Sequence, residues 1–436
     1  MTSAKCSVAR KWHPRRRCQI FYHLAVTRPL GPLTDIALDQ STATPALDTP
    51  PADRRARRTL AATGLNHALH DGYTDLIYVL LPIWQTEFGL GFGILALMRA
   101  LYAGAMAGLQ IPSGRLAERI GGKIILVCGT VFAALGYGLA GLSGSGAGLC
   151  LALMLSGAGS STQHPLASAA VARAYGAAAR HPLGIYNFTG DLGKAAIPAL
   201  LSVLLIIMQW RHALLVLALA GLVVAAYIAV SMPPVGKRRH ANTDGTMEAG
   251  TYSTGFKLLF AIGILDTAVR MGFLTFLPFL MLAKGASLPT SGLALSLVFI
   301  GGAAGKFICG WLGERLGVLR TVLLTEGGTA LGILAVLVLP LAPTMIMLPL
   351  LGVMLNGTSS VLYGTVPDLA PSGRSERAFA LFYTGTIGSG ALAPIMYGLL
   401  GDGFGFIVAT VATAITAAAI FPLAISLARH LQQPAP

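Results

Sequence analysis

The sequence GRLAERIGG at residues 114–122 returns as GWLGERLGV at residues 310–318, 196 positions later. Both copies keep a glycine, a leucine two positions on, a Glu-Arg pair, and a glycine two positions after the arginine. Three more landmarks repeat at the same offset: Pro82 with Pro278, Gly89 with Gly285, and Pro198 with Pro394. A duplication this regular in an apolar chain predicts two homologous membrane halves with a pathway between them.

The composition places this chain in lipid. Hydrophobic residues make up 54% of it, charged residues only 11%, and the mean hydropathy is +0.70. Soluble proteins carry about 25% charged residues. The five cysteines show no metal-binding or disulfide spacing. Because half of the net charge of +14 lies in the N-terminal segment and the rest is spread along an apolar chain, we expect no nucleic-acid partner.

Apolar segments predict twelve transmembrane helices in two pseudo-symmetric halves of six, an all-α membrane fold. We place the spans at about 61–84, 92–113, 123–143, 147–171, 183–207, 211–232, 257–281, 289–312, 320–341, 344–367, 378–400 and 404–427.

The polar segments divide the chain into domains. Residues 1–59 carry half of the net positive charge and lack an apolar run, which predicts a disordered cytoplasmic tail that contacts membrane lipid. The N-terminal half then spans 60–232, a cytoplasmic linker 233–256, the C-terminal half 257–428, and a short tail 429–436.

Basic residues predict the orientation. With the N-terminus inside, the cytoplasmic loops and C-terminus hold fourteen Lys and Arg residues, and the opposite loops hold only Arg211 and Lys284. This is the positive-inside bias of a multi-pass protein of the bacterial cytoplasmic membrane with both termini inside.

The duplicated phrase resembles the signature loop of the major facilitator superfamily, and the resemblance covers about residues 60–428. It implies that the acidic residue of each phrase contacts a neighbouring helix end and helps to hold one conformation. The candidate gating residues are Gly114, Glu118, Arg119, Gly121, Gly310, Glu314, Arg315 and Gly317.

A narrower resemblance comes from the fourth and fifth spans. GAGSSTQHPLASAAVARAYG and LGIYNFTGDLGKAAIPALL, with the Gln110-x-Pro112 end of the second span, resemble the fosmidomycin-resistance branch of that superfamily. This resemblance implies proton-driven efflux of a small drug or metabolite by a secondary transporter, not an enzyme. Asp191 and Lys194 depart from the family pattern, which leaves the substrate open.

Three alternatives to efflux stay open at this point. One is proton-coupled uptake of an organic acid or nutrient, and another is a non-transporting membrane receptor on the same fold. A third is an intramembrane enzyme, which rests only on the histidines and acids of the first span.

The first span carries the densest group of titratable residues. His67, His70, Asp71 and Asp75 fall on one side of a helix at about 100° per residue. Acids and histidines in a partly dehydrated cavity can bind and release protons, as proton-coupled transport requires. Asp71 is our first candidate for the coupling acid and Asp75 the second. The alternative is a hydrogen-bonded structural cluster.

A metal site would need ligands from elsewhere, and His164 is the obvious addition to His67, His70 and Asp71. We expect neither a bound metal nor a cofactor. The expected partners are a small-molecule substrate and the proton, and we expect a monomer.

The remaining charges at span depth are candidates for substrate binding, because an unpaired charge in the hydrocarbon is costly. Asp191 and Lys194, and Asp266 and Arg270, are spaced so that each pair can neutralise itself within one helix. Arg99 has no acid nearby in its own helix and reaches either an acid of the first span or an anion. Aligning the two halves places Thr386 opposite Asp191, Ser389 opposite Lys194, and Gln110 opposite Lys306. The candidates are Arg99, His164, Asp191, Lys194, Asp266, Arg270 and Lys306.

Overall fold

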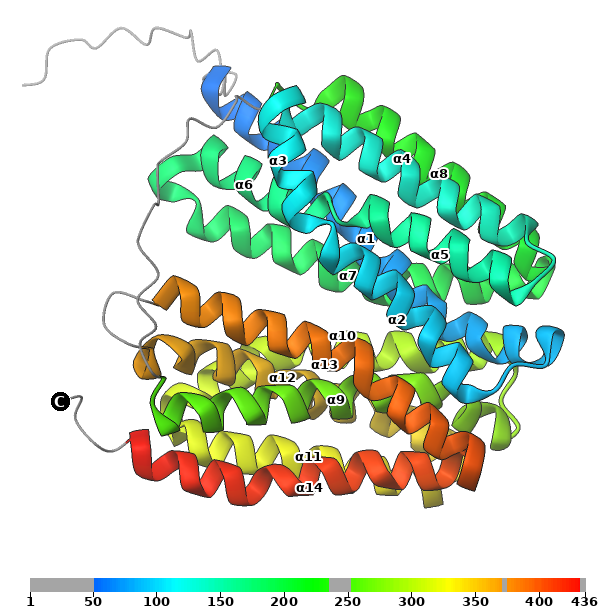
Figure 1. Ribbon diagram of the computed structural model, residues 1–436, viewed down its shortest axis with the longest axis vertical. Helices are drawn as coiled ribbons and strands as arrows, with labels where there is room; N and C mark the ends of the chain where they lie inside the picture. Colours follow the sequence, from blue (N-terminus) through cyan, green and yellow to red (C-terminus); the bar gives the residue numbers. More distant parts are fainter. Residues whose placement is uncertain (1–50, 235–251, 371–374, 432–436) are drawn as a thin grey trace, which may run out of the picture. The chain divides into compact units, whose positions relative to one another are not determined.

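The computed structural model describes residues 51–234, 252–370 and 375–431, and these form an all-helical bundle (Figure 1). The N-terminal half contains α1 (Pro51–Phe88), α2 (Phe92–Gly108), α3 (Gln110–Ile120), α4 (Gly122–Leu142), α5 (Gly146–Ser160), α6 (Gln163–Tyr175), the 3-10 turn η1 (Gly176–Ala178), α7 (Arg180–Ile207) and α8 (Trp210–Ser231). The C-terminal half contains α9 (Thr254–Ala283), α10 (Leu288–Leu316), α11 (Val318–Val338), α12 (Leu341–Leu369), α13 (Ser375–Phe404) and α14 (Phe406–Leu431).

Each expected span coincides with one helix or with two consecutive helices. Among the described residues, nine helices are long and apolar enough to cross a membrane, and α2 with α3, bent by 41°, makes a tenth. The other two expected spans are α1 and the pair α5–α6. The polar residues of α1 lower its hydropathy, and α5–α6 is interrupted at residues 161–162.

The first domain boundary differs from the expected one. Helix α1 begins at Pro51, inside the segment expected to be a disordered tail. Proline is favoured in the first turn of a helix, and the alanines and arginines that follow it are good helix formers. The rest of that tail (1–50), residues 235–251 of the linker and residues 432–436 lie outside the described residues.

The repeat seen in the sequence recurs in the backbone. Gly89 and Gly285 have φ of 62° and 83°, and Gly121 and Gly317 have φ of 118° and 80°. These positive values favour glycine, which explains why it is kept at these turns. The end of the bundle with Gly121 and Gly317 is called the motif end below, and the end with Gly89 and Gly285 the opposite end.

The packing of the two halves follows the same plan. Helix α1 packs against α7 as α9 packs against α13, and α4 packs against α8 as α11 packs against α14. The halves meet mainly through two equivalent pairs, α2 with α13 and α10 with α7. In Figure 1 the N-terminal half, coloured blue to green, lies above the C-terminal half, coloured green to red.

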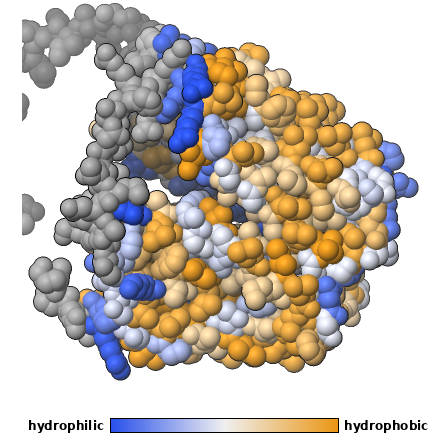
Figure 2. All heavy atoms as spheres, viewed as in Figure 1, coloured by the Kyte–Doolittle hydropathy of each residue, from blue (hydrophilic) through white to orange (hydrophobic). Residues whose placement is uncertain are grey.

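Apolar side chains cover the outside as well as the core. Tyr73, Trp84 and Tyr137 are fully buried in the N-terminal half, while Val230 and Val338 are more than four-fifths exposed. The hydrophobic surface in Figure 2 is far larger than a soluble monomer tolerates. It is the surface expected of a protein whose spans face lipid.

Candidate functional site

A cavity of about 260 Å³ between the two halves collects most of the charges predicted at span depth. Figure 2 shows the surface hollowed between the halves on the side where α1 begins, which is the motif end. Helices α1, α2, α6, α7, α9, α10, α12 and α13 all contribute to the cavity. Its charged and histidine residues are Asp71, Asp75, Arg99, His164, Asp191, Lys194, Arg270 and Lys306.

Asp71 is the centre of a four-residue cluster. Its carboxylate lies 3.4 Å from Nζ of Lys194, 3.3 Å from Nε2 of His67 and 3.6 Å from Nε2 of His164. Asp71 is 7% exposed, whereas the side chains of Lys194 and His164 are about one-third exposed to the cavity. The buried acid is therefore connected to water through its two partners from α6 and α7.

Two glycines let α7 approach this cluster. A Cβ on Gly193 would lie 1.9 Å from the carbonyl oxygen of Ala68, so α1 and α7 touch backbone to backbone there. A Cβ on Gly190 would lie 2.6 Å from His67 Nε2 and 2.8 Å from Asp71 Oδ2. The glycine-rich character of the fifth span thus makes room for the cluster.

The contacts of His67 define a candidate proton-binding position. Its Nδ1 lies 2.8 Å from the carbonyl oxygen of Tyr186, and since a carbonyl only accepts, Nδ1 is the donor of that hydrogen bond. Its Nε2 then faces Asp71 Oδ2 at 3.3 Å. A proton bound between these two atoms would be shared in a charge-assisted hydrogen bond. The His67–Asp71 pair is therefore a candidate site for binding one proton.

His70 does not share this environment. Its two ring nitrogens contact the hydroxyls of Ser160 and Thr130, at 2.9 and 3.2 Å, and the residue is fully buried between α1, α4 and α5. The expectation that His70 acts with Asp71 is corrected here. The two side chains are about 100° apart around the helix, enough to point into different interfaces.

The acid cluster also bears on the metal alternative. His67, Asp71 and His164 place one ligand atom each within 4.8 Å of one another, a set that could hold a metal ion. The ammonium of Lys194 lies against the same carboxylate, and this cation opposes a divalent ion at the site.

The sequence allowed Lys194 to pair with Asp191 of the same helix, but no salt bridge forms between them. Lys194 contacts Asp71 of α1, and Asp191 is instead bound by Nζ of Lys306 of α10, which donates to both carboxylate oxygens. The longer contact is 2.8 Å. The Asp191–Lys306 salt bridge therefore joins the N-terminal half to the C-terminal half.

The two arginines of the cavity differ in their partners. Arg99 lies 3.9 Å from Asp75 and 5.0 Å from the ring centroid of Tyr78, so it reaches an acid of the first span as one alternative predicted. Arg270 has no salt bridge or hydrogen bond among the described residues, and its Nε is buried without a partner. Among the described cations of the cavity it is the one without a salt bridge, although Asp75 and Asp266 interact with it electrostatically.

Asp266 forms no salt bridge with Arg270, although the two residues interact electrostatically within α9. It is 4% exposed, and its carboxyl interacts with Glu326 of α11, which is 1% exposed and also contacts Thr358. Asp266 does not line the cavity, so its assignment to substrate binding is weakened.

The duplicated phrases form helix ends rather than loops. Gly114, Glu118 and Arg119 lie in α3, and Gly310, Glu314 and Arg315 lie in the last turns of α10. Only Gly121 and Gly317 lie between helices. Arg315 stacks on Trp311 at 4.3 Å, while Glu118 and Glu314 make no salt bridge among the described residues. Their gating role stays a prediction for another conformation.

The opposite end is held closed by a contact that the sequence did not reveal. Asp402 of α13 accepts hydrogen bonds from the backbone amides of Phe92 and Gly93, at 2.6 and 3.0 Å, and so caps α2 from the other half. A Cβ on Gly91 would lie 2.8 Å from this carboxylate, which explains the glycine there. No spacing rule in the sequence could have matched residues this far apart.

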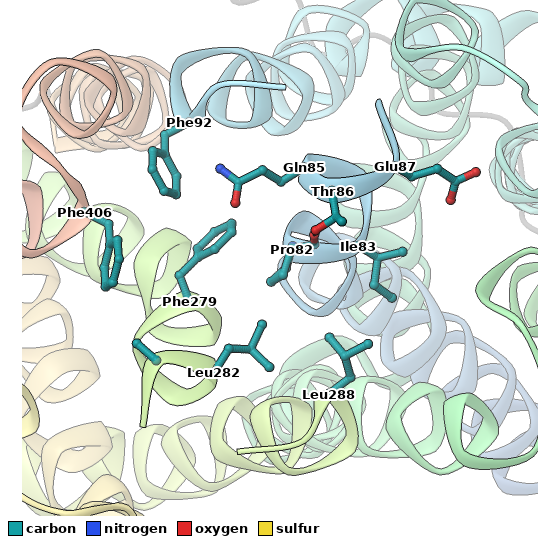
Figure 3. A pocket seen from close by; sticks show the side chains of 11 residues that line it. Pro82, Ile83, Gln85, Thr86, Glu87, Phe92, Phe279, Leu282, Leu288 and Phe406 are labelled. Atoms are coloured by element: carbon teal, nitrogen blue, oxygen red, sulfur yellow. The ribbon is translucent and has the colours of Figure 1, made fainter. Parts of the chain in front are cut away.

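A second cavity, of about 660 Å³, lies beside this contact and is mostly apolar (Figure 3). The figure shows Phe92, Phe279 and Phe406 grouped on one side and Leu282 and Leu288 below. Although larger, this cavity holds only Glu87 as a charged residue, and Glu87 pairs with Arg211. The ion chemistry therefore belongs to the smaller cavity.

Comparison with known proteins establishes the family. The sequence profile of the Major Facilitator Superfamily matches residues 63–260 and again 258–435. The chain belongs to the major facilitator superfamily. It is a secondary transporter that binds small molecules and crosses the membrane several times, not an enzyme, and the duplicated phrase had indicated this correctly.

Two curated superfamily relatives are similar over most of their length. The fosmidomycin resistance protein of Escherichia coli K12 is 27% identical over 364 residues, covering 79% of this chain and 86% of the relative. A probable sulfoacetate transporter of Cupriavidus necator is 26% identical over 357 residues, covering 74% and 82%.

Solved structures confirm the fold alone. A bacterial homologue of the human lysosomal transporter Spinster, inward-facing and occupied, superposes with a TM-score of 0.73 at 16% identity and covers 89% of this chain and 100% of its own. A nucleoside transporter superposes with a TM-score of 0.72 at 11% identity, covering 86% and 100%.

Proposed function

We propose that this superfamily member is a proton-coupled exporter of a small organic anion in the bacterial cytoplasmic membrane. Asp71, with His67, is the proton-binding pair, and Arg270 is the first contact for the anion. The observation that carries the proposal is the His67–Asp71 contact, which offers a proton two facing acceptor atoms and lies beside the cavity between the halves. Lys194 and His164 connect it to water.

The distribution of basic residues supports an orientation for the transporter. Fourteen Lys and Arg residues against two favour a cytoplasmic location for both termini and for the motif end. The hollow at the motif end then faces the cytoplasm, and Asp402 closes the outer end. In this assignment the transporter is inward-open and ready to take up its solute from inside.

The charge pattern supports an anionic solute. Asp71, Asp75 and Asp191 each form a salt bridge with another cation, so the guanidinium of Arg270, which forms none among the described residues, is the group left to recruit a negative charge. Thr267, Asn356 and Tyr363 line the same side of the cavity and offer neutral hydrogen-bonding groups. Arginine suits carboxylate, sulfonate and phosphonate groups because it can bind two oxygens at once.

Proton-coupled uptake of an organic acid is the second candidate. The similarity to a probable sulfoacetate transporter favours it, because sulfoacetate is an organic anion. Efflux and uptake use the same pair and the same arginine, and they differ in the direction in which the anion and the proton move.

Transport by purified protein in liposomes tests both candidates. Vesicles contain a pH-sensitive dye, and either fosmidomycin or sulfoacetate is added outside in the absence of a pH gradient. Exchange of the solute for protons and co-transport with protons change the internal pH in opposite directions. Solute movement with no change in internal pH, at any imposed gradient, would contradict proton coupling.

A further inference from the structure

Four charges from three helices stand in alternating order beside the cavity: Asp71 of α1, Lys194 and Asp191 of α7, and Lys306 of α10. Each charge interacts with the next. Lys194 interacts electrostatically with Asp71, Asp75 and Asp191, and of these Asp75 already has Arg99 as its salt-bridge partner. The first member belongs to the proton-binding pair, and the last belongs to the other half of the transporter.

Lys194 is placed between two acids. It lies 3.4 Å from Asp71, and it follows Asp191 by three residues on α7, a spacing that puts both side chains on one helix face. Because Lys194 contacts Asp71, the carboxylate of Asp191 pairs with Lys306 instead. The side chains of Lys194 and Lys306 are 32% and 42% exposed, so neither ammonium is locked by packing.

A proton added to the His67–Asp71 pair cancels the negative charge that holds Lys194. An ammonium without a counter-charge at this depth is costly, and Asp191 is the acid on its own helix face. Lys194 then competes with Lys306 for Asp191. Since the Asp191–Lys306 salt bridge joins the halves, its weakening changes the balance between the two access states.

We infer that Lys194 is a positioning residue that transmits the protonation of Asp71 to the salt bridge between the halves by exchanging Asp71 for Asp191. This inference rests on the proposed function, because it takes Asp71 as the coupling acid. It adds the route by which a proton in the N-terminal half acts on the interface.

Several other groups surround Asp71 and titrate or carry charge in the same field. They are His67, His70 and Asp75 of α1, Tyr102 of α2, His164 of α6, Tyr186 of α7, Lys306 of α10 and Tyr383 of α13. Of these, Lys306 alone also contacts Asp191. The exchange therefore has one route through α7, and it passes through Lys194.

The test measures the separation of the halves at the motif end as a function of pH. Spin labels are attached through Leu116→Cys on α3 and Leu316→Cys on α10, two exposed positions, in full-length protein without its native cysteines in liposomes. Wild type is expected to shift its distance distribution between acidic and alkaline pH. Lys194→Gln should lose that shift, and Lys194→Arg, which keeps the charge, should retain it.

Two further variants complete the test. Lys306→Gln removes the same bridge from the other half and should also abolish the shift, which covers the case that Lys194→Gln does not insert. Lys123→Gln, in the first turn of α4 and outside the cavity, should keep it. A full shift in Lys194→Gln or in Lys306→Gln would overturn the inference and leave Asp71 as the coupling acid. A wild type without any shift would overturn both the inference and the proposed coupling.

Discussion

The two halves share one scaffold and differ in the chemistry placed on it. At the repeat offset, Thr267 stands in α9 where Asp71 stands in α1. Thr386 and Ser389 stand in α13 where Asp191 and Lys194 stand in α7. The hydroxyls bond locally, as Thr386 does to Tyr363 and Ser389 to the backbone of α9, whereas the charged residues bond across helices.

The two halves therefore contribute different kinds of side chain to the cavity. In the N-terminal half, Asp71 and Asp75 have Lys194 and Arg99 as partners, and Asp191 pairs with Lys306 of the other half. The C-terminal half offers neutral hydrogen-bonding groups around Arg270, which forms no salt bridge among the described residues. A duplicated fold permits this because the shared turns and prolines preserve the bundle while cavity positions change.

Replacing Asp71 should have the largest effect. Asp71→Asn removes the proton-binding carboxyl but keeps its size, so we expect proton-driven transport to be abolished while the protein still inserts. Solute flux in liposomes under an imposed pH gradient measures this, and solute exchange without a gradient is the control. Full pH-driven activity in this variant would remove Asp71 as the coupling residue.

Replacing Arg99 tests whether a cation of the N-terminal half stabilises the fold. Arg99→Gln leaves Asp75 buried without a cation, and breaking a buried pair in this way costs about 3–5 kcal/mol. We expect a marked fall in thermal stability in detergent. Adding Asp75→Asn should recover part of the loss, because the uncompensated charge is then gone. Equal stability of the single and double variants would mean that the pair is not coupled.

Replacing Arg270 tests whether the anion binds to the C-terminal half. A hydrogen bond to a charged group contributes about 1.5–3 kcal/mol, so Arg270→Gln should weaken apparent affinity for an anion by about 10- to 150-fold. The apparent affinity of Arg270→Lys should fall between those of the wild type and Arg270→Gln. Concentration dependence of sulfoacetate or fosmidomycin transport measures this, and an unchanged half-saturation in Arg270→Gln would place the anion elsewhere.

Asp402 tests the contact between the halves at the opposite end and should have the smallest effect. Losing a helix N-cap costs about 0.5–2 kcal/mol, so Asp402→Ala should shift the population modestly away from the state closed at that end. Asp402→Asn should shift it less, since an amide oxygen also caps. Spin-label distances across that end report the shift, and a more tightly closed end in Asp402→Ala would contradict the assignment.

The sequence was sufficient for the scaffold because its signals are local. Apolar runs, the repeated glycines and the two phrases are each read within one helix or turn, and they located the halves and every span. It also brought Asp71, Lys194, Lys306 and Arg99 to notice, because a charge in an apolar run is conspicuous.

Partners could not be derived in the same way. The helix spacing of Asp191 and Lys194 favoured a pair within α7, but the backbone contact at Gly193 brings Asp71 closer, and α10 supplies Lys306. His70 lies on a face that only the packing of α4 and α5 defines. Asp402 gave no signal because its partners lie on a distant segment.

The cap on α2 has one further consequence. First-turn amides of a helix have no carbonyl partner within their own helix, so those of Phe92 and Gly93 depend for protection on a carboxylate from the other half. Their rate of hydrogen–deuterium exchange therefore measures how often the opposite end opens. The exchange of these two amides therefore reports on the transport cycle, and it can be followed in the unlabelled protein before the solute is identified.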